Sequence, residues 1–62
     1  MKKLFYIRNT KNDQNFDTVE MRFYPSSWNP VLEYDNEYLQ SLIDSDSIKF
    51  ENCIVEEVEI NE

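Results

Sequence analysis

The chain has 62 residues, of which 13 are acidic and 6 are basic, so its formal net charge at pH 7 is −7. A chain of this length buries only about 60% of its unfolded surface, which leaves little room for an enclosed catalytic pocket. It has no histidine and one cysteine, Cys53, which excludes an intramolecular disulfide and any Ser–His or Cys–His catalytic pair. We therefore expect residues 1–62 to form a single acidic, non-catalytic domain.

Residues 3–11 and 17–24 are predicted to form two strands joined as an antiparallel hairpin. The second segment alternates apolar with polar residues, the apolar ones being Val19, Met21 and Phe23. Residues 12–15, Asn-Asp-Gln-Asn, supply the turn. Because the chain has no glycine, turn positions with positive φ are expected to use Asn or Asp, which tolerate that region best after glycine.

A helix is predicted after the breaker segment 25–30. Asn29 followed by Pro30 is a typical helix start, and Asp35 is a second candidate N-cap five residues beyond Pro30. Apolar residues then recur at spacings of three and four, as in an amphipathic helix: Val31, Tyr34, Tyr38, Leu39, Leu42 and Ile43. Residues 44–47, Asp-Ser-Asp-Ser, are expected to end the helix.

Residues 48–60 are predicted to form the last strand. The positions of Val55 and Glu56 break its alternation, so we expect a bulge near residues 52–53 or 56–57. The pattern does not indicate whether this strand pairs with the first strand or the second. The predicted fold is α+β, a three-stranded antiparallel or mixed sheet in the order β-β-α-β with one face covered by the helix.

The expected cellular compartment and the expected absence of a metal both rest on motifs that the sequence does not contain. The apolar run at Leu4–Ile7 is shorter than the roughly 7–15 residues of a secretory signal, and a lone cysteine is typical of a reduced cytoplasm. Asp44-x-Asp46 resembles the start of a calcium loop but lacks its glycine and closing glutamate, so no metal or other cofactor is expected. Cys53 is expected to be a small buried apolar residue.

Direct binding to nucleic acid is not expected. Five bases lie in the predicted hairpin: Lys2, Lys3, Arg8, Lys11 and Arg22. Strand alternation places Arg8 and Lys11 on opposite faces, so the bases do not form a coherent patch for phosphates.

The acidic residues are concentrated in one part of the chain. Residues 25–62 contain ten of them against one base, Lys49, a balance of −9. If the helix and the last strand pack side by side, carboxylates would cover one broad surface that imitates the phosphates of a nucleic acid. The candidate binding residues are Glu33, Asp35, Glu37, Glu51, Glu56, Glu57 and Glu59, with Glu62 at the end of the strand. The alternative is that these acids only solvate the domain and prevent edge-to-edge aggregation.

Two aromatic residues complete the candidate site. Trp28, between Pro25 and Pro30, and Tyr34 are candidate interface anchors, since Trp and Tyr dominate binding energy at interfaces. Burial of Trp28 beneath the loop is the alternative, and we favour it because a small domain rarely exposes so large an apolar side chain.

In length, charge and composition the chain resembles the small acidic proteins with which bacteriophages block host enzymes, including nucleases and bacterial defence systems. That resemblance rests on no motif, so no residue is carried over from it. It implies an inhibitor or modulator in the host cytoplasm, acting on a protein with a basic nucleic-acid-binding surface. The alternative is a structural or regulatory interaction module that binds through a sheet edge or exposed aromatic residues, including as a homodimer.

Overall fold

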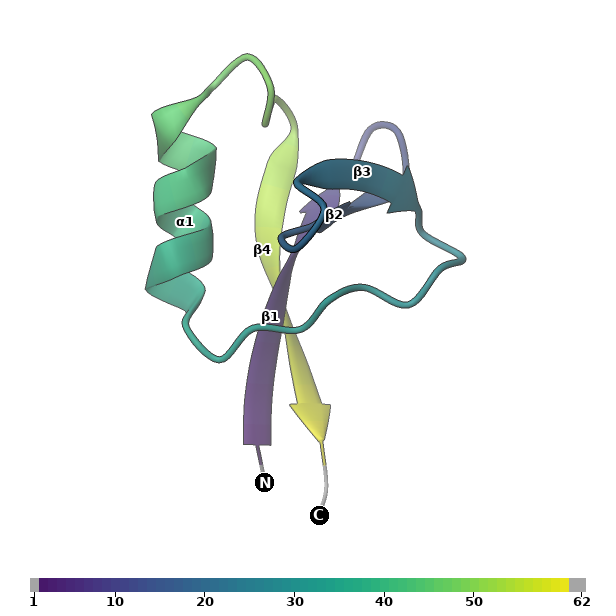
Figure 1. Cartoon of the computed structure of the whole chain (residues 1–62), viewed down its shortest axis with the longest axis vertical. Helices are drawn as coiled ribbons and strands as arrows, with labels where there is room; N and C mark the ends of the chain where they lie inside the picture. The colour runs from purple at the N-terminus through teal and green to yellow at the C-terminus, as the bar shows by residue number, and fades with distance from the viewer. Residues whose placement is uncertain (1, 61–62) are drawn as a thin grey trace.

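The computed structural model describes residues 2–60 and is an α+β fold with one helix packed on one antiparallel sheet (Figure 1). The elements are β1 (Lys2–Asn9), β2 (Gln14–Asp17), β3 (Arg22–Pro25), α1 (Asn36–Ser45) and β4 (Cys53–Ile60). The four strands lie in the order β3-β2-β1-β4, and every neighbouring pair is antiparallel. The last strand therefore pairs with the first, which the sequence had left open. Within residues 2–60, no helix has the length and apolar character that a membrane crossing requires.

The predicted hairpin is present, but its turn lies at residues 10–13. The side chain of Asn9 organises this turn, because its Oδ1 accepts hydrogen bonds from the backbone N–H groups of Lys11 (3.0 Å) and Asn12 (2.9 Å). Asp13 adopts a φ of 54°, and Asn52 adopts 62° in a later turn. The expectation that Asn and Asp replace glycine is confirmed at these two positions, but it was wrong at Met21, which has a φ of 56°.

The prediction of one strand over residues 17–24 was wrong, since this segment turns at residues 18–21 and joins two separate strands. Asp17 Oδ1 accepts hydrogen bonds from the backbone N–H groups of Val19 (2.8 Å) and Glu20 (2.9 Å), which folds the chain back on itself. Met21 then has a φ of 56°, and Val19 is 76% exposed. The apolar alternation therefore belongs to a turn, and the sheet has four strands instead of three.

The helix begins at Asn36, and Asp35 is its N-cap. Of the two predicted helix starts, the second is therefore confirmed. Asp35 Oδ1 accepts hydrogen bonds from the backbone N–H groups of Glu37 (3.0 Å) and Tyr38 (3.3 Å). The predicted end at residues 44–47 is confirmed, because the last helical residue is Ser45. The start at Asn29 was wrong: residues 29–35 are not helical, and Glu33 forms an isolated bridge with Phe5.

The choice between the two caps can be tested by substitution. We expect Asp35→Ala to lower the free energy of unfolding by about 1 kcal/mol, because two backbone N–H groups lose their acceptor. Asn29→Ala, the matched control, is expected to change it by less than about 0.5 kcal/mol. Urea denaturation followed by circular dichroism measures both variants, and equal effects would contradict the assigned cap.

The last strand is shorter than predicted and has no bulge. Residues 47–52 form turns, in which Asp46 accepts a hydrogen bond from the Lys49 N–H at 3.0 Å, so the strand begins at Cys53. Its register with β1 runs without interruption from Asn9↔Cys53 to Lys2↔Ile60. The irregular pattern instead reflects apolar residues on both faces of β4.

The core lies between α1 and the sheet. Its buried apolar residues are Ile7, Phe16, Leu39 and Phe50. Phe16 contacts Phe23 and Phe50 edge to face, with ring centroids 4.9 and 4.8 Å apart. Of the helix, only Leu39 is fully buried, with Leu42 and Ile43 packed against the same cluster.

Candidate functional site

The candidate carboxylates of β4 are divided between the two faces of the sheet. Val55 packs on the core, so strand alternation places Glu57 and Glu59 on the same side as Val55 and places Glu56 on the opposite side. Glu57 and Glu59 are exposed, whereas Glu56 is half-buried opposite Tyr6. Of the three, Glu57 and Glu59 are therefore the ones presented together to a partner.

Two other candidates are engaged in holding the fold together. Glu33 is half-buried, accepts a 2.6 Å hydrogen bond from the Thr18 hydroxyl, and exchanges two 2.8 Å backbone hydrogen bonds with Phe5. Asp35 caps the helix. Glu37, in the first turn of α1, is exposed, and its carboxylate forms no ion pair within residues 2–60.

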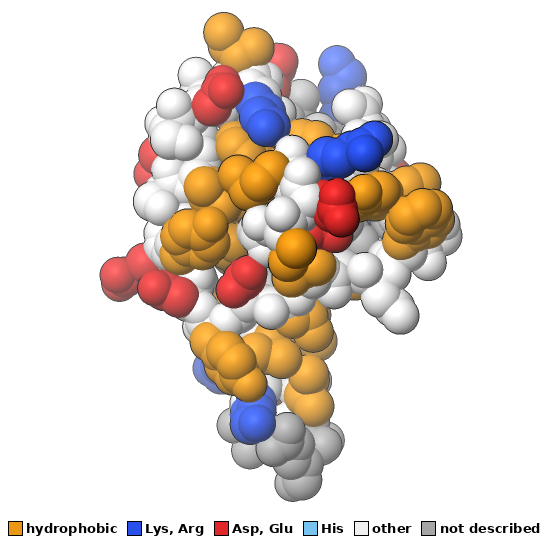
Figure 2. Space-filling model, viewed as in Figure 1, with side chains coloured by type: hydrophobic (Ala, Val, Ile, Leu, Met, Phe, Trp, Pro, Cys, Tyr) orange, Lys and Arg blue, Asp and Glu red, His pale blue; other side chains and the backbone are white. Residues whose placement is uncertain are grey.

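The remaining candidate carboxylates are those of Glu51 and Glu62. Glu51 is exposed in the turn before β4, and Glu62 lies outside the described residues. On the face shown in Figure 2, acidic side chains are separated from one another by apolar and uncharged groups. The helix and β4 do pack on the same core, as the prediction required, but the acidic side chains visible on this face do not form one continuous surface.

The outer edge of β4 is open. Phe5 directs its backbone N–H and C=O toward Glu33, away from β4, so the even-numbered residues of β1 bond to β4. The outward backbone groups of β4 consequently belong to Val55, Glu57 and Glu59. In residues 2–60 these groups have no backbone partner. An extended segment of another protein could therefore pair with this edge.

Trp28 is 58% exposed, so the favoured expectation that it is buried was wrong. Its indole stacks on the ring of Tyr24, with centroids 5.0 Å apart and an interplanar angle of 15°. The core is already filled by three phenylalanines, which leaves the indole on the surface. Tyr34 is 72% exposed, so both aromatic candidates are accessible to a partner.

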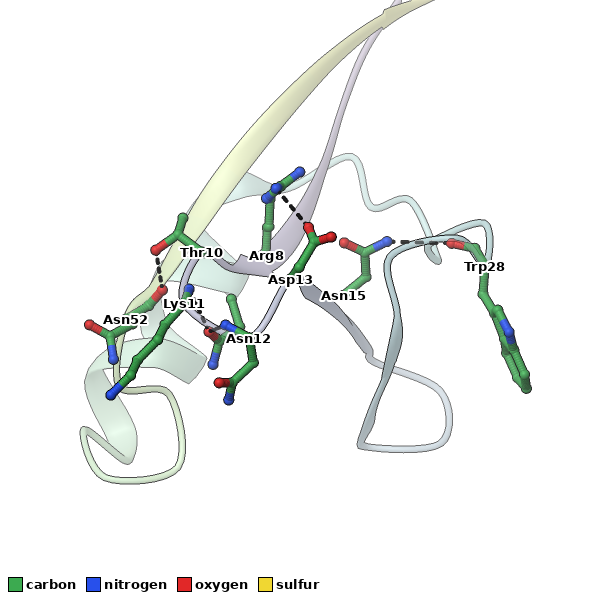
Figure 3. Close-up of polar contacts among 9 residues, drawn as sticks. Arg8, Thr10, Lys11, Asn12, Asp13, Asn15, Trp28 and Asn52 are labelled. Carbon is green, nitrogen blue, oxygen red and sulfur yellow. Dashed lines mark hydrogen bonds and ion pairs between the residues drawn. The ribbon is translucent and has the colours of Figure 1, made fainter.

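The structure also forms a pocket that sequence reasoning missed. It has a volume of about 200 Å³ and is lined by residues 15–17 of β2, Glu20, Tyr24 and residues 28–31. Asn15 is 6% exposed, and its Nδ2 donates a 3.4 Å hydrogen bond to the Trp28 carbonyl oxygen (Figure 3). The prolines flanking Trp28 were the only sequence signal near it.

Three of the basic residues, Arg8, Arg22 and Lys49, contact other side chains in the described structure. Arg8 forms a 2.8 Å ion pair with Asp13 (Figure 3), and the Arg22 guanidinium lies 5.7 Å from the centre of the Tyr24 ring. Lys49 Nζ lies 5.4 Å from the Phe16 ring centre. Each of these three bases therefore lies against an acidic or aromatic side chain of the chain itself.

Cys53 is half-buried and packs against the core. Burial raises the pKa of its thiol, an effect that a hydrogen bond with Asn9 partly offsets. The neutral thiol is thus favoured, and its Sγ donates to the Glu51 carbonyl oxygen at 3.6 Å. Within residues 2–60, no group of three or more His, Cys, Asp or Glu side chains could hold a metal ion.

Comparison of the chain with protein-family models, with curated proteins and with solved structures finds no match.

Proposed function

We propose that this chain is a non-catalytic inhibitor or modulator that occupies a basic nucleic-acid-binding surface of a protein target. The observation that carries this proposal is the pair Glu57 and Glu59, exposed side by side on the open strand β4 with no ion-pair partner in the described structure. The net charge of −7 adds a long-range field that favours a basic partner. A phage-type inhibitor of a host nuclease or defence protein, acting in the host cytoplasm, agrees with the length, charge and composition.

Association by charge mimicry is expected to depend on salt. Carboxylates that replace phosphates on a basic surface attract it across solvent, and salt screens this attraction. We expect the affinity for the target to fall roughly tenfold or more as ionic strength rises from about 0.05 to about 0.5 M. The target is first recovered from a bacterial lysate with the tagged protein and eluted in a stepped salt gradient. Isothermal titration calorimetry with the purified target then gives the affinities.

A pair of charge reversals separates the β4 surface from net charge alone. Glu57→Lys and Asp44→Lys change the net charge equally, but only Glu57 lies on β4. We expect Glu57→Lys to weaken binding more than Asp44→Lys. An affinity that is indifferent to salt, or equal losses in the two variants, would contradict mimicry by this surface.

The second candidate function is an interaction module that binds through the edge of β4 or through the exposed aromatic residues. It is favoured by the 58% exposure of Trp28 and the unpaired outer edge of β4. If the module binds through the exposed aromatic residues, Trp28→Ala abolishes binding, whereas reversal of Glu56, Glu57 and Glu59 leaves it intact. Homodimers that pair β4 about a twofold axis at Glu56, Glu57 or Val58 place Glu opposite Glu, which disfavours them.

A further inference from the structure

The pocket beside Trp28 is held open by two hydrogen bonds that attach the loop before α1 to the sheet. At one end, Asn15 Nδ2 donates to the Trp28 carbonyl oxygen at 3.4 Å. At the other, the Thr18 hydroxyl donates to Glu33 Oε1 at 2.6 Å. Residues 29–31 lie between these two attachments and form one wall of the pocket. The buried ring of Phe16 contributes to the lining.

Among the described residues that line this pocket, Asn15 has an almost completely buried side chain with one amide atom that lacks a hydrogen-bond partner. Its Oδ1 accepts no hydrogen bond from residues 2–60. The reverse orientation of the amide would set Oδ1 against the Trp28 carbonyl oxygen, which is also an acceptor, so the assignment is determined by chemistry. A buried acceptor without a donor is unfavourable, and Asn15 therefore has capacity for one further N–H group.

Oδ1 is enclosed in the present arrangement, so an incoming donor must reorient the amide. The Asn15 to Trp28 hydrogen bond, at 3.4 Å, is at the long limit for such bonds. The terminal torsion of an asparagine side chain is also broad. A guanidinium that donates to the Trp28 carbonyl oxygen in place of Asn15 would let the amide turn about this torsion, and Oδ1 could then accept from the same guanidinium.

The rest of the lining favours a cation. Asp17 and Glu20 contribute carboxylates, and Tyr24 and Trp28 contribute aromatic rings. The protein already places one guanidinium near one of these two rings, since the Arg22 guanidinium lies 5.7 Å from the Tyr24 ring centre. Negative charge, an aromatic wall and a spare acceptor are together the features that recognise a cationic N–H donor.

We propose that this pocket binds the guanidinium group of an arginine side chain presented by the partner protein. Arginine fits better than lysine because its planar group stacks on aromatic rings, is weakly hydrated, and has donors for both the carboxylates and Asn15. The inference rests on the proposed function, in that a basic protein surface supplies the arginine. It adds a defined anchoring point at β2 and β3, at the other end of the strand order from the open edge of β4.

The test uses short peptides as probes, so it does not require the target. Acetyl-Gly-Arg-Gly-amide is titrated into the ¹⁵N-labelled full-length chain, alongside the matched peptides with lysine or with uncharged citrulline. We expect saturable shifts of the Asn15 side-chain amide and the Trp28 indole resonances with the arginine peptide. Citrulline should bind at least about fivefold more weakly, because it keeps the shape and loses the charge. Trp28 is the single tryptophan, so its fluorescence gives an independent readout.

Two charge-neutralising variants locate the binding. Glu20→Gln is expected to raise the apparent Kd of the arginine peptide about two- to fivefold, whereas Asp44→Asn, on α1 outside the pocket, changes it less than about twofold. The pocket assignment would be overturned by any one of three results. These are equal affinity for the citrulline and arginine peptides, equal effects of the two variants, or resonance shifts that do not include the Asn15 side-chain amide. None of these outcomes bears on the proposed charge mimicry. That proposal is tested separately, by the salt dependence of the affinity for the target.

Discussion

Phe16→Ala is expected to lower the free energy of unfolding by about 3–5 kcal/mol, the largest effect of any substitution considered for this chain. Phe16 is fully buried and makes edge-to-face contacts with both Phe23 and Phe50. Its removal leaves a cavity at the centre of the core and removes both aromatic contacts. A domain of 62 residues has a total stability of only about 3–9 kcal/mol, so this loss removes a large part of the stability of the domain.

Urea denaturation followed by the fluorescence of Trp28 measures this effect. Val19→Ala is the matched control, because Val19 is 76% exposed and its loss is expected to cost less than about 0.5 kcal/mol. Phe16→Leu keeps an apolar side chain in place and should be intermediate. If Phe16→Ala and Val19→Ala unfolded at the same urea concentration, the assigned core would be wrong.

Leu39→Ala is expected to lower the free energy of unfolding by about 2–5 kcal/mol and to release α1 from the sheet. Leu39 is the fully buried residue of this ten-residue helix. Isolated helices shorter than about 12–15 residues are marginal in water, so the stability of α1 depends on its packing. Loss of this one contact therefore affects the whole helix.

Amide hydrogen exchange gives the specific readout for this variant. We expect faster exchange throughout α1, with a smaller change in the ladder between β1 and β4. Tyr38→Ala, in the same helix at a position that is 43% exposed, is the control for helix propensity and should retain protection. Uniform acceleration in all elements would show instead that α1 and the sheet unfold as one unit.

The carboxylates of β4 and the pocket beside Trp28 are positioned by different kinds of contact. Glu57 and Glu59 depend on the register of β4 with β1, which is continuous over eight residue pairs. Trp28 and the pocket depend on a loop attached by side-chain hydrogen bonds at Asn15 and Thr18. A substitution in the loop is thus expected to alter the pocket while leaving the carboxylates of β4 in place.

Local chemistry was sufficient to predict several parts of this protein from its sequence. The cap at Asp35, the helix end at residues 44–47 and the Asn and Asp residues at positive φ are each set by a side chain and its nearest backbone neighbours. The α+β class follows from the order of extended and helical patterns. These features require no knowledge of distant contacts.

The strand assignments failed where two local signals competed. In residues 17–24 the apolar alternation indicated one strand, but Asp17 binds the following backbone N–H groups and forces a turn. That turn allows Phe16 and Phe23 to meet in the core, a gain that exceeds the loss from exposing Val19. Only the packed structure shows which signal prevails.

For the candidate site, composition determined the negative charge, and the tertiary structure decided where each charge points. Glu57 and Glu59 face one way and Glu56 the other because an uninterrupted register with β1 imposes strict alternation. Trp28 is exposed because phenylalanines from β2, β3 and the turn before β4 already fill the core. The pocket at Asn15 joins residues of β2 and β3 to a loop that no short-range pattern connects to them. Such features arise from contacts between segments distant in the chain, and local propensity does not encode those contacts.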